Sequence, residues 1–279
     1  MLNFITICES ESNSDTYTYF DQQPKSYFAE QNINTAFIIR SHIGYSYQLV
    51  SLIYSLNSQV NYSGKILCAI VPTEHSDVAP LTGFLKRAIP EDILDKVFFT
   101  VLKFSKATYQ KYSDILPVLC TKERKEMLIR KIGIKPSDME LVCSINCPLH
   151  YHITDLSIRY VLHSCPSCQY MVVTNGDNSY SPSFLSLTTA MLSENHAVVT
   201  DMVHQDRYYS VRLMLAEMDL GGLVIRTDVM KSANLSFINA MPPDAEAHIY
   251  HAADFHFVNR LKALGLNVVI LHKVLFTHN

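Results

Sequence analysis

Glycine and proline are scarce in this sequence, which has only 8 Gly and 11 Pro among 279 residues. Fibrous chains and low-complexity disordered chains need far more of one or both. The remaining composition, 48% hydrophobic and 18% charged, is typical of a globular protein with a buried core. This length allows one large domain or two small ones, and we expect one compact domain.

Basic clusters and long apolar runs are also lacking. The formal net charge is -3 and no Lys/Arg block could neutralise several phosphates, so nucleic acid is not an expected partner. The start, MLNFITICESESNSD, has no basic region and turns polar after about seven positions, which is too short for a signal peptide. No run reaches the roughly 18 apolar residues of a membrane span. We therefore expect a soluble, cytoplasmic chain with no transmembrane segment, although a chain trimmed of its targeting segment would look the same.

The cysteines do not form an even set, because there are seven and a complete disulfide framework would leave one over. Two close pairs, Cys143 with Cys147 and Cys165 with Cys168, resemble zinc ligands, but they flank apolar segments and not glycine-rich knuckles. A redox pair is another alternative for Cys165 and Cys168, although such motifs normally follow a strand and this one precedes a strand. We favour buried thiols, since free cysteine packs as a small apolar side chain.

Apolar runs alternate with helical patterns over the first part of the chain. Buried strands are predicted at residues 35–40, 65–72, 97–102 and 170–174. Helices are predicted around residues 49–56, 105–134 and 155–163, the last with Thr154 as its N-cap. This alternation predicts an α/β fold with a mostly parallel central sheet and helices on both faces.

The last third of the chain has a mixed pattern. Residues 197–200 are predicted as an edge strand, 221–226 as a strand that opens with two glycines, 252–264 as an amphipathic helix and 267–271 as a last strand. We therefore expect a parallel first half joined to a mixed second half.

Polar residues follow three of the predicted strands, at Arg40-Ser-His42, Thr73-Glu74 and Asn175-Gly-Asp177. Ligands of parallel sheets bind beyond the carboxyl ends of the strands, so these three loops are expected to converge on one crevice. The sequence Asn-Gly-Asp-Asn from Asn175 is also typical of a tight turn. On its own residues, the turn is the favoured interpretation of Asp177.

Several segments resemble, in order and spacing, the GT-A glycosyltransferases. AFIIRSHIGYSYQLVSLIYSL is similar to the opening strand, donor loop and first helix of that fold, and YHITDLSIRYVLHSCPSCQYMVVTNGDNSY to the helix, turn and strand before its DxD motif. MDLGGLVIR, AADFHFVNRL and HKVLFTHN are similar to its acceptor-side strand, its acid-bearing helix and its metal-binding histidine. The resemblance implies one GT-A domain with an N-terminal arm (about residues 1–34), a nucleotide-sugar-binding half (about 35–185) and an acceptor-binding half (about 186–279).

The resemblance also implies a metal and donor site. Asn175-Gly-Asp177 stands where the family has DxD, so Asn175 would face the donor ribose and Asp177 would hold a metal together with His278. Asn175 removes one carboxylate from the family pattern. Mn²⁺ or Mg²⁺ is expected, because such hard cations take oxygen ligands and bridge a diphosphate, and imidazole suits Mn²⁺ better. Further candidates for donor contacts, each of which could equally cap a turn or lie on the surface, are Arg40, His42, Glu74 and Asp155.

For catalysis, the resemblance points to Asp254 as the general base that deprotonates the acceptor hydroxyl in inverting enzymes. The family often has Glu-Asp here, and this chain has Ala253-Asp254. An Asp near a helix start is also favoured by the helix dipole, so capping is an equal alternative. His251 is a second candidate base, and Asp219 is a candidate for binding acceptor hydroxyls or for forming a turn.

The resulting hypothesis is a metal-dependent glycosyltransferase, a hexosyl- or pentosyltransferase, that moves a sugar from a nucleoside diphosphate, preferably UDP, to a carbohydrate hydroxyl with inversion. A non-catalytic carbohydrate- or nucleotide-sugar-binding domain is the main alternative, since Asn175 and Ala253 depart from the family pattern. A sugar nucleotidyltransferase fits less well, because it needs a glycine-rich basic loop, and the loop after the first strand has one glycine and one arginine.

Overall fold

The computed structural model of the protein describes residues 28, 31–90, 94–113, 126, 130, 147–214, 218–242 and 252–279. Within these residues nine strands form one sheet in the order β3-β2-β1-β4-β8-β6-β9-β5, with β7 paired to β6. The strands are β1 (Ile33–Ser41), β2 (Lys65–Pro72), β3 (Val97–Val101), β4 (Tyr170–Asn175), β5 (Ser179–Tyr180), β6 (Ala197–His204), β7 (Arg207–Tyr209), β8 (Leu223–Arg226) and β9 (Val268–His278).

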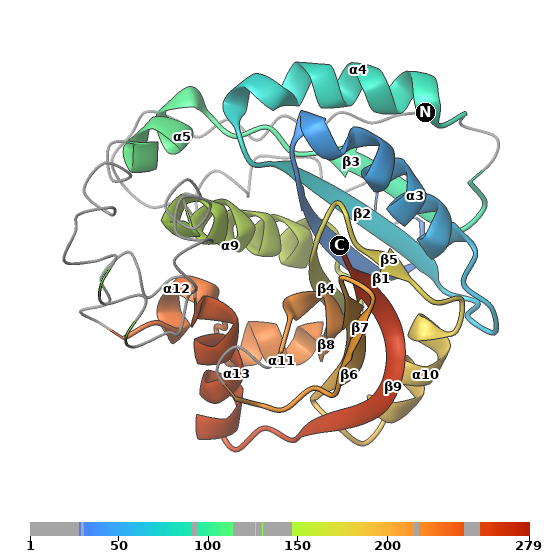
Figure 1. The fold of residues 1–279 in the computed structure, drawn as a ribbon, viewed down its shortest axis with the longest axis vertical. Coiled ribbons are helices and arrows are strands. Elements are labelled where there is room, and N and C mark those ends of the chain that lie inside the picture. The colour runs from blue at the N-terminus through green and yellow to red at the C-terminus, as the bar shows by residue number, and fades with distance from the viewer. Residues whose placement is uncertain are drawn as a thin grey trace.

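Helices cover both faces of this sheet (Figure 1). The α-helices are α3 (Ser46–Asn57), α4 (Val78–Ala88), α5 (Lys106–Ser113), α9 (Cys147–Ser164), α10 (Phe184–Met191), α11 (Thr227–Ser232), α12 (Phe237–Ala240) and α13 (Ala253–Ala263). In the described part of the chain, three short 3-10 helices, η1 (Ile43–Tyr45), η2 (His75–Asp77) and η5 (Leu220–Gly222), lie at strand ends.

The parallel half consists of β3, β2, β1 and β4, whose neighbours all pair in parallel. The second half is mixed, because β8 runs antiparallel to both β4 and β6, whereas β9 runs parallel to β6. This arrangement confirms the predicted α/β fold with a mostly parallel sheet and a mixed second half. The strand predicted at residues 65–72 matches β2 at both ends.

Two apolar cores follow from the alternation of side chains along each strand. On β1, Ala36 and Ile38 pack into the core that contains α9 and α13, whereas Phe37 and Ile39 pack into the core that contains α3, α4 and α10. Because both faces are buried, the parallel strands appear in the sequence as continuous apolar runs.

Three predictions about element position were wrong. The strand at residues 197–200 is not an edge strand, since β6 lies between β8 and β9. The last strand does not stop at residue 271, because β9 keeps its pairing with β6 as far as His278 although residues 272–274 are exposed. The helix predicted from residue 155 begins at Cys147, so Thr154 lies inside it and donates its hydroxyl to the carbonyl oxygen of His150, 2.6 Å away.

The other segment predictions fall partly outside the described residues. The helix predicted at 105–134 is seen as α5, and its remainder is outside the described residues apart from residues 126 and 130. Most of the arm at residues 1–34 is also outside them, and Ile33 and Asn34 belong to β1. Within the described ranges no helix is long and apolar enough to cross a lipid bilayer.

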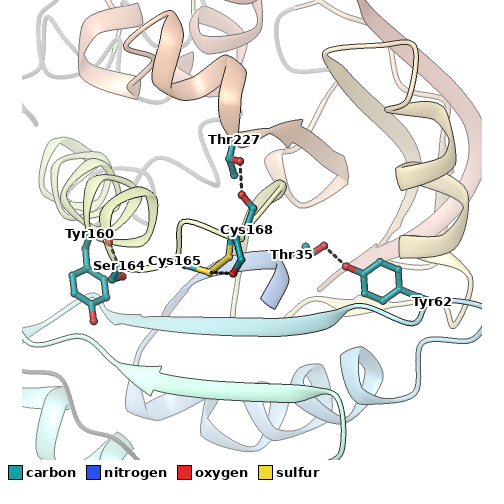
Figure 2. Close-up of a disulfide and its surroundings, with 8 residues drawn as sticks. Thr35, Tyr62, Tyr160, Ser164, Cys165, Cys168 and Thr227 are labelled. Carbon is teal, nitrogen blue, oxygen red and sulfur yellow. Dashed lines mark hydrogen bonds between the residues drawn. A yellow bond between two sulfur atoms is a disulfide. The ribbon is translucent and has the colours of Figure 1, made fainter. Parts of the chain in front are cut away.

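Cys165 and Cys168 form a disulfide in the turn between α9 and β4 (Figure 2). Both are buried, as predicted, but neither is a free thiol and their sulfurs are not available to zinc. The turn is also held by Thr227, whose hydroxyl donates to the carbonyl oxygen of Cys168 at 2.5 Å. The disulfide therefore removes Cys165 and Cys168 from the proposed four-cysteine zinc site, and the side chains of Cys143 and Cys147 are outside the described residues.

Candidate active site

The carboxyl ends of β1 and β4 meet at one edge of the sheet, where Arg40 and Asn175 are direct partners in the parallel register. Nε of Arg40 donates to Oδ1 of Asn175 at 3.1 Å, and the guanidinium carbon lies 5.1 Å from the centre of the Tyr151 ring. Burial alone would lower the pKa of Arg40, but Tyr151 and Asp254 nearby raise it, so the guanidinium is charged. This site therefore has a fixed positive charge beside the residue that stands in place of the first DxD acid.

Asp177 follows in a tight turn, closed by the hydrogen bond from the amide of Asn178 to the carbonyl of Asn175 at 3.3 Å. Gly176 is needed in this turn because its amide bonds the carbonyl of Arg40 at 2.7 Å and a Cβ would lie 2.5 Å from Oγ of Ser41. The turn and the ligand interpretations of Asp177 are thus compatible. Its Oδ1 is buried and has no hydrogen-bond partner within the described residues, and burial raises the pKa of its carboxyl.

His278, at the end of β9, faces Asp219, which precedes η5. Nδ1 of His278 lies 3.2 Å from Oδ2 of Asp219, while Oδ1 of Asp219 accepts the amide of Gly221 at 2.7 Å. Burial would raise the pKa of Asp219 and lower that of His278, but their mutual attraction moves both pKa values the other way. The turn role predicted for Asp219 is confirmed by the bond to Gly221, and its contact with His278 is an additional finding.

Asp254 lies in the first turn of α13, with Tyr151 of α9 as its partner. The Tyr151 hydroxyl donates to Oδ1 of Asp254. Burial and the nearby Asp219 raise the pKa of Asp254 to about 6, although Arg40, Tyr151 and the backbone of Leu220 act in the opposite direction. A carboxylate with this pKa is ionised at neutral pH and is closer to the value that suits a general base than an exposed Asp. His251, the alternative base, is outside the described residues.

The other three residues predicted to contact the donor, His42, Glu74 and Asp155, make different contacts in the structure. His42 caps η1 by accepting the amide of Gly44 on Nδ1 at 3.1 Å, and Glu74 is exposed and accepts the hydroxyl of Ser76. Asp155 is buried inside α9 and accepts the amides of Phe237 and Ile238, at 2.8 and 2.9 Å. Asp155 therefore anchors the start of α12, and we leave it out of the candidate site.

Three residues near the site were missed by sequence reasoning. Tyr151 and His150 lie in the part of α9 before the predicted helix start. Burial, with Arg40 and His42 nearby, lowers the pKa of His150 to about 4, so this imidazole is neutral. Asp77 is buried and joins two loops by accepting the amide of Ile43 at 3.1 Å. If the helix had been predicted to start at Pro148, a residue type favoured in the first helical turn, the prediction would have included Tyr151.

The donor set fits a hard divalent cation in part. Of the two residues predicted as ligands, Asp177 has a buried Oδ1 with no hydrogen-bond partner among the described residues. The buried Nδ1 of His278 lies at ion-pair distance from Asp219, 3.2 Å, and makes no hydrogen bond of good geometry within the same residues. Across those same residues, however, no three His, Cys, Asp or Glu side chains are arranged as a complete metal site. Mg²⁺-type sites commonly take only one or two carboxylates and complete their coordination with substrate phosphates and water.

No protein-family model matches this chain, and no curated protein matches it by sequence. Among solved structures, TarS 1-349 of S. aureus has a TM-score of 0.51 at 9% identity, covering 88% of this chain and 60% of its own. The same protein in complex with UDP has a TM-score of 0.50 at 11% identity, covering 88% of this chain and 60% of its own. The mannosyltransferase PcManGT of Pyrobaculum calidifontis, in complex with GDP-Man and Mn²⁺, has a TM-score of 0.52 at 10% identity, covering 94% of this chain and 61% of its own.

These likenesses establish the fold as GT-A type. At 9–11% identity they concern the fold alone. This chain spans about 60% of the length of the structures it matches.

Proposed function

We propose that this chain is a metal-dependent glycosyltransferase that moves a sugar from a nucleoside diphosphate to a carbohydrate hydroxyl. The observation that carries the proposal is the gathering, at one edge of a GT-A sheet, of a buried cation, a buried carboxylate base, a buried carboxylate oxygen without a hydrogen-bond partner and a buried imidazole, supplied by Arg40, Asp254, Asp177 and His278. Structures with this fold have been solved with UDP and with GDP-Man and Mn²⁺, which supports a nucleotide-sugar donor. UDP remains our preferred nucleotide.

The donor half of the site consists of residues after β1 and β4. Asp177 and His278 would hold Mn²⁺ or Mg²⁺, which when bound offsets the charge of the departing diphosphate. Arg40 adds a fixed positive charge on the same edge, and Asn175, held by Arg40, presents its amide nitrogen to the donor. Residues 186–279 would bind the acceptor.

The chemical step falls to Asp254. As the acceptor oxygen bonds to the anomeric carbon and the bond to the leaving phosphate oxygen breaks, the carboxylate of Asp254 takes the hydroxyl proton. Attack from the side opposite the leaving group gives inversion. Such general-base catalysis typically contributes about 10²- to 10⁴-fold in rate. Tyr151 holds the carboxylate in place.

Titration calorimetry with UDP-sugars and GDP-sugars, with and without Mn²⁺, tests the proposal. We expect one donor class to bind with Mn²⁺ present and to raise the melting temperature by mass action. Asp177→Ala should abolish the Mn²⁺-stimulated binding while the protein stays folded, and Glu194→Ala, at an exposed position after α10, is the matched control. Folded wild-type protein that binds no nucleotide sugar in the presence of Mn²⁺ would sink the proposal.

A non-catalytic nucleotide-sugar-binding domain is the second candidate. The bond between Arg40 and Asn175 favours it, because the guanidinium occupies the residue that stands in place of the first DxD acid. Product analysis separates the two candidates. A binding domain would bind donor without consuming it, whereas an enzyme would release the nucleoside diphosphate in proportion to the sugar transferred.

A further inference from the structure

The short strand β7 lies at the same edge of the sheet as the candidate active site. Because β8 runs antiparallel to both β4 and β6, the carboxyl ends of β4 and β6 lie at the same edge, and β9 runs parallel to β6. His204 at the end of β6 pairs with His278 on one side and with Arg207 of β7 on the other. The hairpin of β6 and β7 therefore stands directly beside His278.

All three residues of β7 are exposed, so a buried core does not hold this strand. Tyr208 and Tyr209 are 60% and 40% exposed. Two residues join β6 to β7, Gln205 and Asp206, and both have positive φ values, 48° and 60°, as the tight type I′ hairpin turn requires. The strand thus carries two exposed tyrosines on a short, closed hairpin.

A buried carboxylate fixes this exposed hairpin. Asp201 of β6 is fully buried, and its Oδ2 accepts the hydroxyl of Tyr208 at 2.8 Å. Its Oδ1 accepts the amide of Val211, also at 2.8 Å, and lies 3.3 Å from Nδ1 of His272. A buried carboxylate is costly unless its oxygens are satisfied, so these contacts bind the hairpin firmly to the sheet. The tyrosines are therefore held in a fixed arrangement although they face solvent.

The two tyrosines point to opposite faces because they are neighbours on one strand. Tyr208 turns toward Asp201, whereas the ring of Tyr209 lies on the face of His204, with ring centres 6.1 Å apart. The rings of His204 and His278 are 4.6 Å apart, and Nδ1 of His204 donates to the carbonyl oxygen of His278 at 3.0 Å. Tyr209, His204 and His278 form a row of rings, the ring row, that leads from the exposed strand to the candidate site.

The ring row has the chemistry of a carbohydrate subsite. One face of a sugar ring consists of C–H groups, which pack on an aromatic ring, while the hydroxyls around the rim need hydrogen-bond partners. Tyr209 supplies the aromatic ring. Because Nδ1 of His204 carries the hydrogen that faces the carbonyl oxygen, Nε2 of the neutral imidazole can accept a hydroxyl.

We propose that Tyr209 stacks against a sugar ring of the carbohydrate acceptor and that His204 binds one of its hydroxyls. This inference rests on the proposed function and adds to it a surface that recognises the acceptor. The ring row belongs to β6, β7 and β9, whereas the proposed donor residues Arg40 and Asn175 lie at the ends of β1 and β4. The row therefore suits the acceptor and leaves the donor its own side of the edge.

The alternative is that Tyr209 only packs on His204 and supports the hairpin. Its loss would then lower the melting temperature and leave the carbohydrate affinity of the folded protein unchanged. A stacking role predicts the opposite pattern, because carbohydrate affinity depends on the exposed face of the ring. Replacement by phenylalanine separates the ring from the hydroxyl, since it keeps the stacking face.

The experiment measures the binding of methyl glycosides to the full chain by saturation-transfer-difference NMR, alone and with UDP and Mg²⁺. The probes are the α and β methyl glycosides of glucose, galactose, mannose and N-acetylglucosamine. Tyr209→Ala removes the ring, Tyr209→Phe keeps it, and His204→Phe keeps a ring without its nitrogens. Tyr54→Ala is the matched control, because Tyr54 is 36% exposed on α3, and melting temperatures show which variants are folded.

We expect at least one glycoside to bind wild type and Tyr209→Ala to raise its Kd about ten-fold. His204→Phe should also weaken binding, whereas Tyr209→Phe and Tyr54→Ala should match wild type. UDP affinity, measured by calorimetry, should be the same in all of them. Wild-type glycoside affinity in folded Tyr209→Ala, or wild-type protein that binds UDP but none of the glycosides, would overturn the inference and leave the proposed function standing. Glycoside binding that depends on Tyr209 in a protein that binds no nucleotide sugar would instead remove the transferase function and keep the carbohydrate subsite.

Discussion

The hydroxyl of Tyr151 donates a hydrogen bond to Asp254, and the ring of the same tyrosine lies 5.1 Å from the guanidinium carbon of Arg40. One side chain of α9 thus joins the proposed base on α13 to the buried cation on β1. Tyr151 also packs on Phe237, with ring centres 5.1 Å apart, which fixes the direction of its hydroxyl.

Tyr151→Phe is expected to shift the pH dependence of sugar transfer. Burial is the main reason that the pKa of Asp254 is raised to about 6, and the bond from Tyr151 lowers it. Because a general base acts in its ionised form, activity should rise as pH increases through about 6. Loss of the hydroxyl raises the pKa further, so the rise should move to higher pH by about half a unit, with kcat near pH 6 falling about two-fold.

The measurement is the pH profile of kcat for wild type, Tyr151→Phe and the control Tyr54→Phe, whose ring lies on the exposed side of α3. The KM for the donor should stay constant, since the aromatic ring remains in contact with Arg40. An unchanged acidic limb in Tyr151→Phe would contradict the assignment of Asp254 as the base.

Arg40→Lys is expected to weaken donor binding although it conserves the charge. Lysine has no Nε group to donate to Asn175 and no planar guanidinium to lie over Tyr151. We expect about a ten-fold rise in the donor dissociation constant by calorimetry, equivalent to about 1.4 kcal/mol. Arg226→Lys, at the start of α11, controls for the loss of a guanidinium, and equal affinity in both variants would remove Arg40 from the donor site.

Asp155→Ala is expected to reduce stability and leave the donor affinity of folded protein unchanged. The amides of Phe237 and Ile238 lose their acceptor, which should lower the free energy of unfolding by about 2 kcal/mol. Burial raises the pKa of Asp155 to about 6, so the folded state binds a proton more tightly than the unfolded state. Its contribution to stability therefore falls as pH rises from about 4 to about 6.

Urea unfolding of wild type and Asp155→Ala at several pH values checks this sign, since the stability difference should shrink as pH rises. A difference that grows with pH would show that the ionised carboxylate is the better partner for the two amides. Donor affinity that drops along with stability in folded protein would return Asp155 to the donor site.

The sequence predicted the parallel strands well because their local signal is strong. A strand with both faces buried, such as β2, is a continuous apolar run, and polar residues mark its end. The same local logic placed Asn175 and Asp177 at the carboxyl end of a strand, where β4 ends. It failed for β9, whose exposed polar residues His272 and Lys273 interrupt the apolar run, although the pairing with β6 resumes at Val274 after a shift in register.

The relationships that define the candidate site were harder to predict because they join distant segments. Nothing local to Asp219 indicates that its second oxygen faces His278, and the two-glycine sequence after it suggested a turn with equal weight. Tyr151 was missed for a different reason, since the start of α9 was placed eight residues too late, at Asp155 and not at Cys147. Sequence patterns thus predicted where the loops of the candidate site lie, whereas the contacts between those loops depend on tertiary packing.

Reduction of the disulfide between Cys165 and Cys168 is expected to cost little stability. The two cysteines are three positions apart, and closing so short a loop removes little entropy from the unfolded chain, which corresponds to about 2 kcal/mol. The turn also keeps its hydrogen bonds from Cys165 N to Val161 O at 2.9 Å and from Gln169 N to Asn34 O at 2.8 Å. Dithiothreitol should therefore lower the melting temperature by only a few degrees.

The double variant Cys165→Ser, Cys168→Ser should melt at the lower temperature with or without reductant. Loss of folding on treatment with a zinc chelator, with no effect of dithiothreitol, would instead show that these cysteines bind metal.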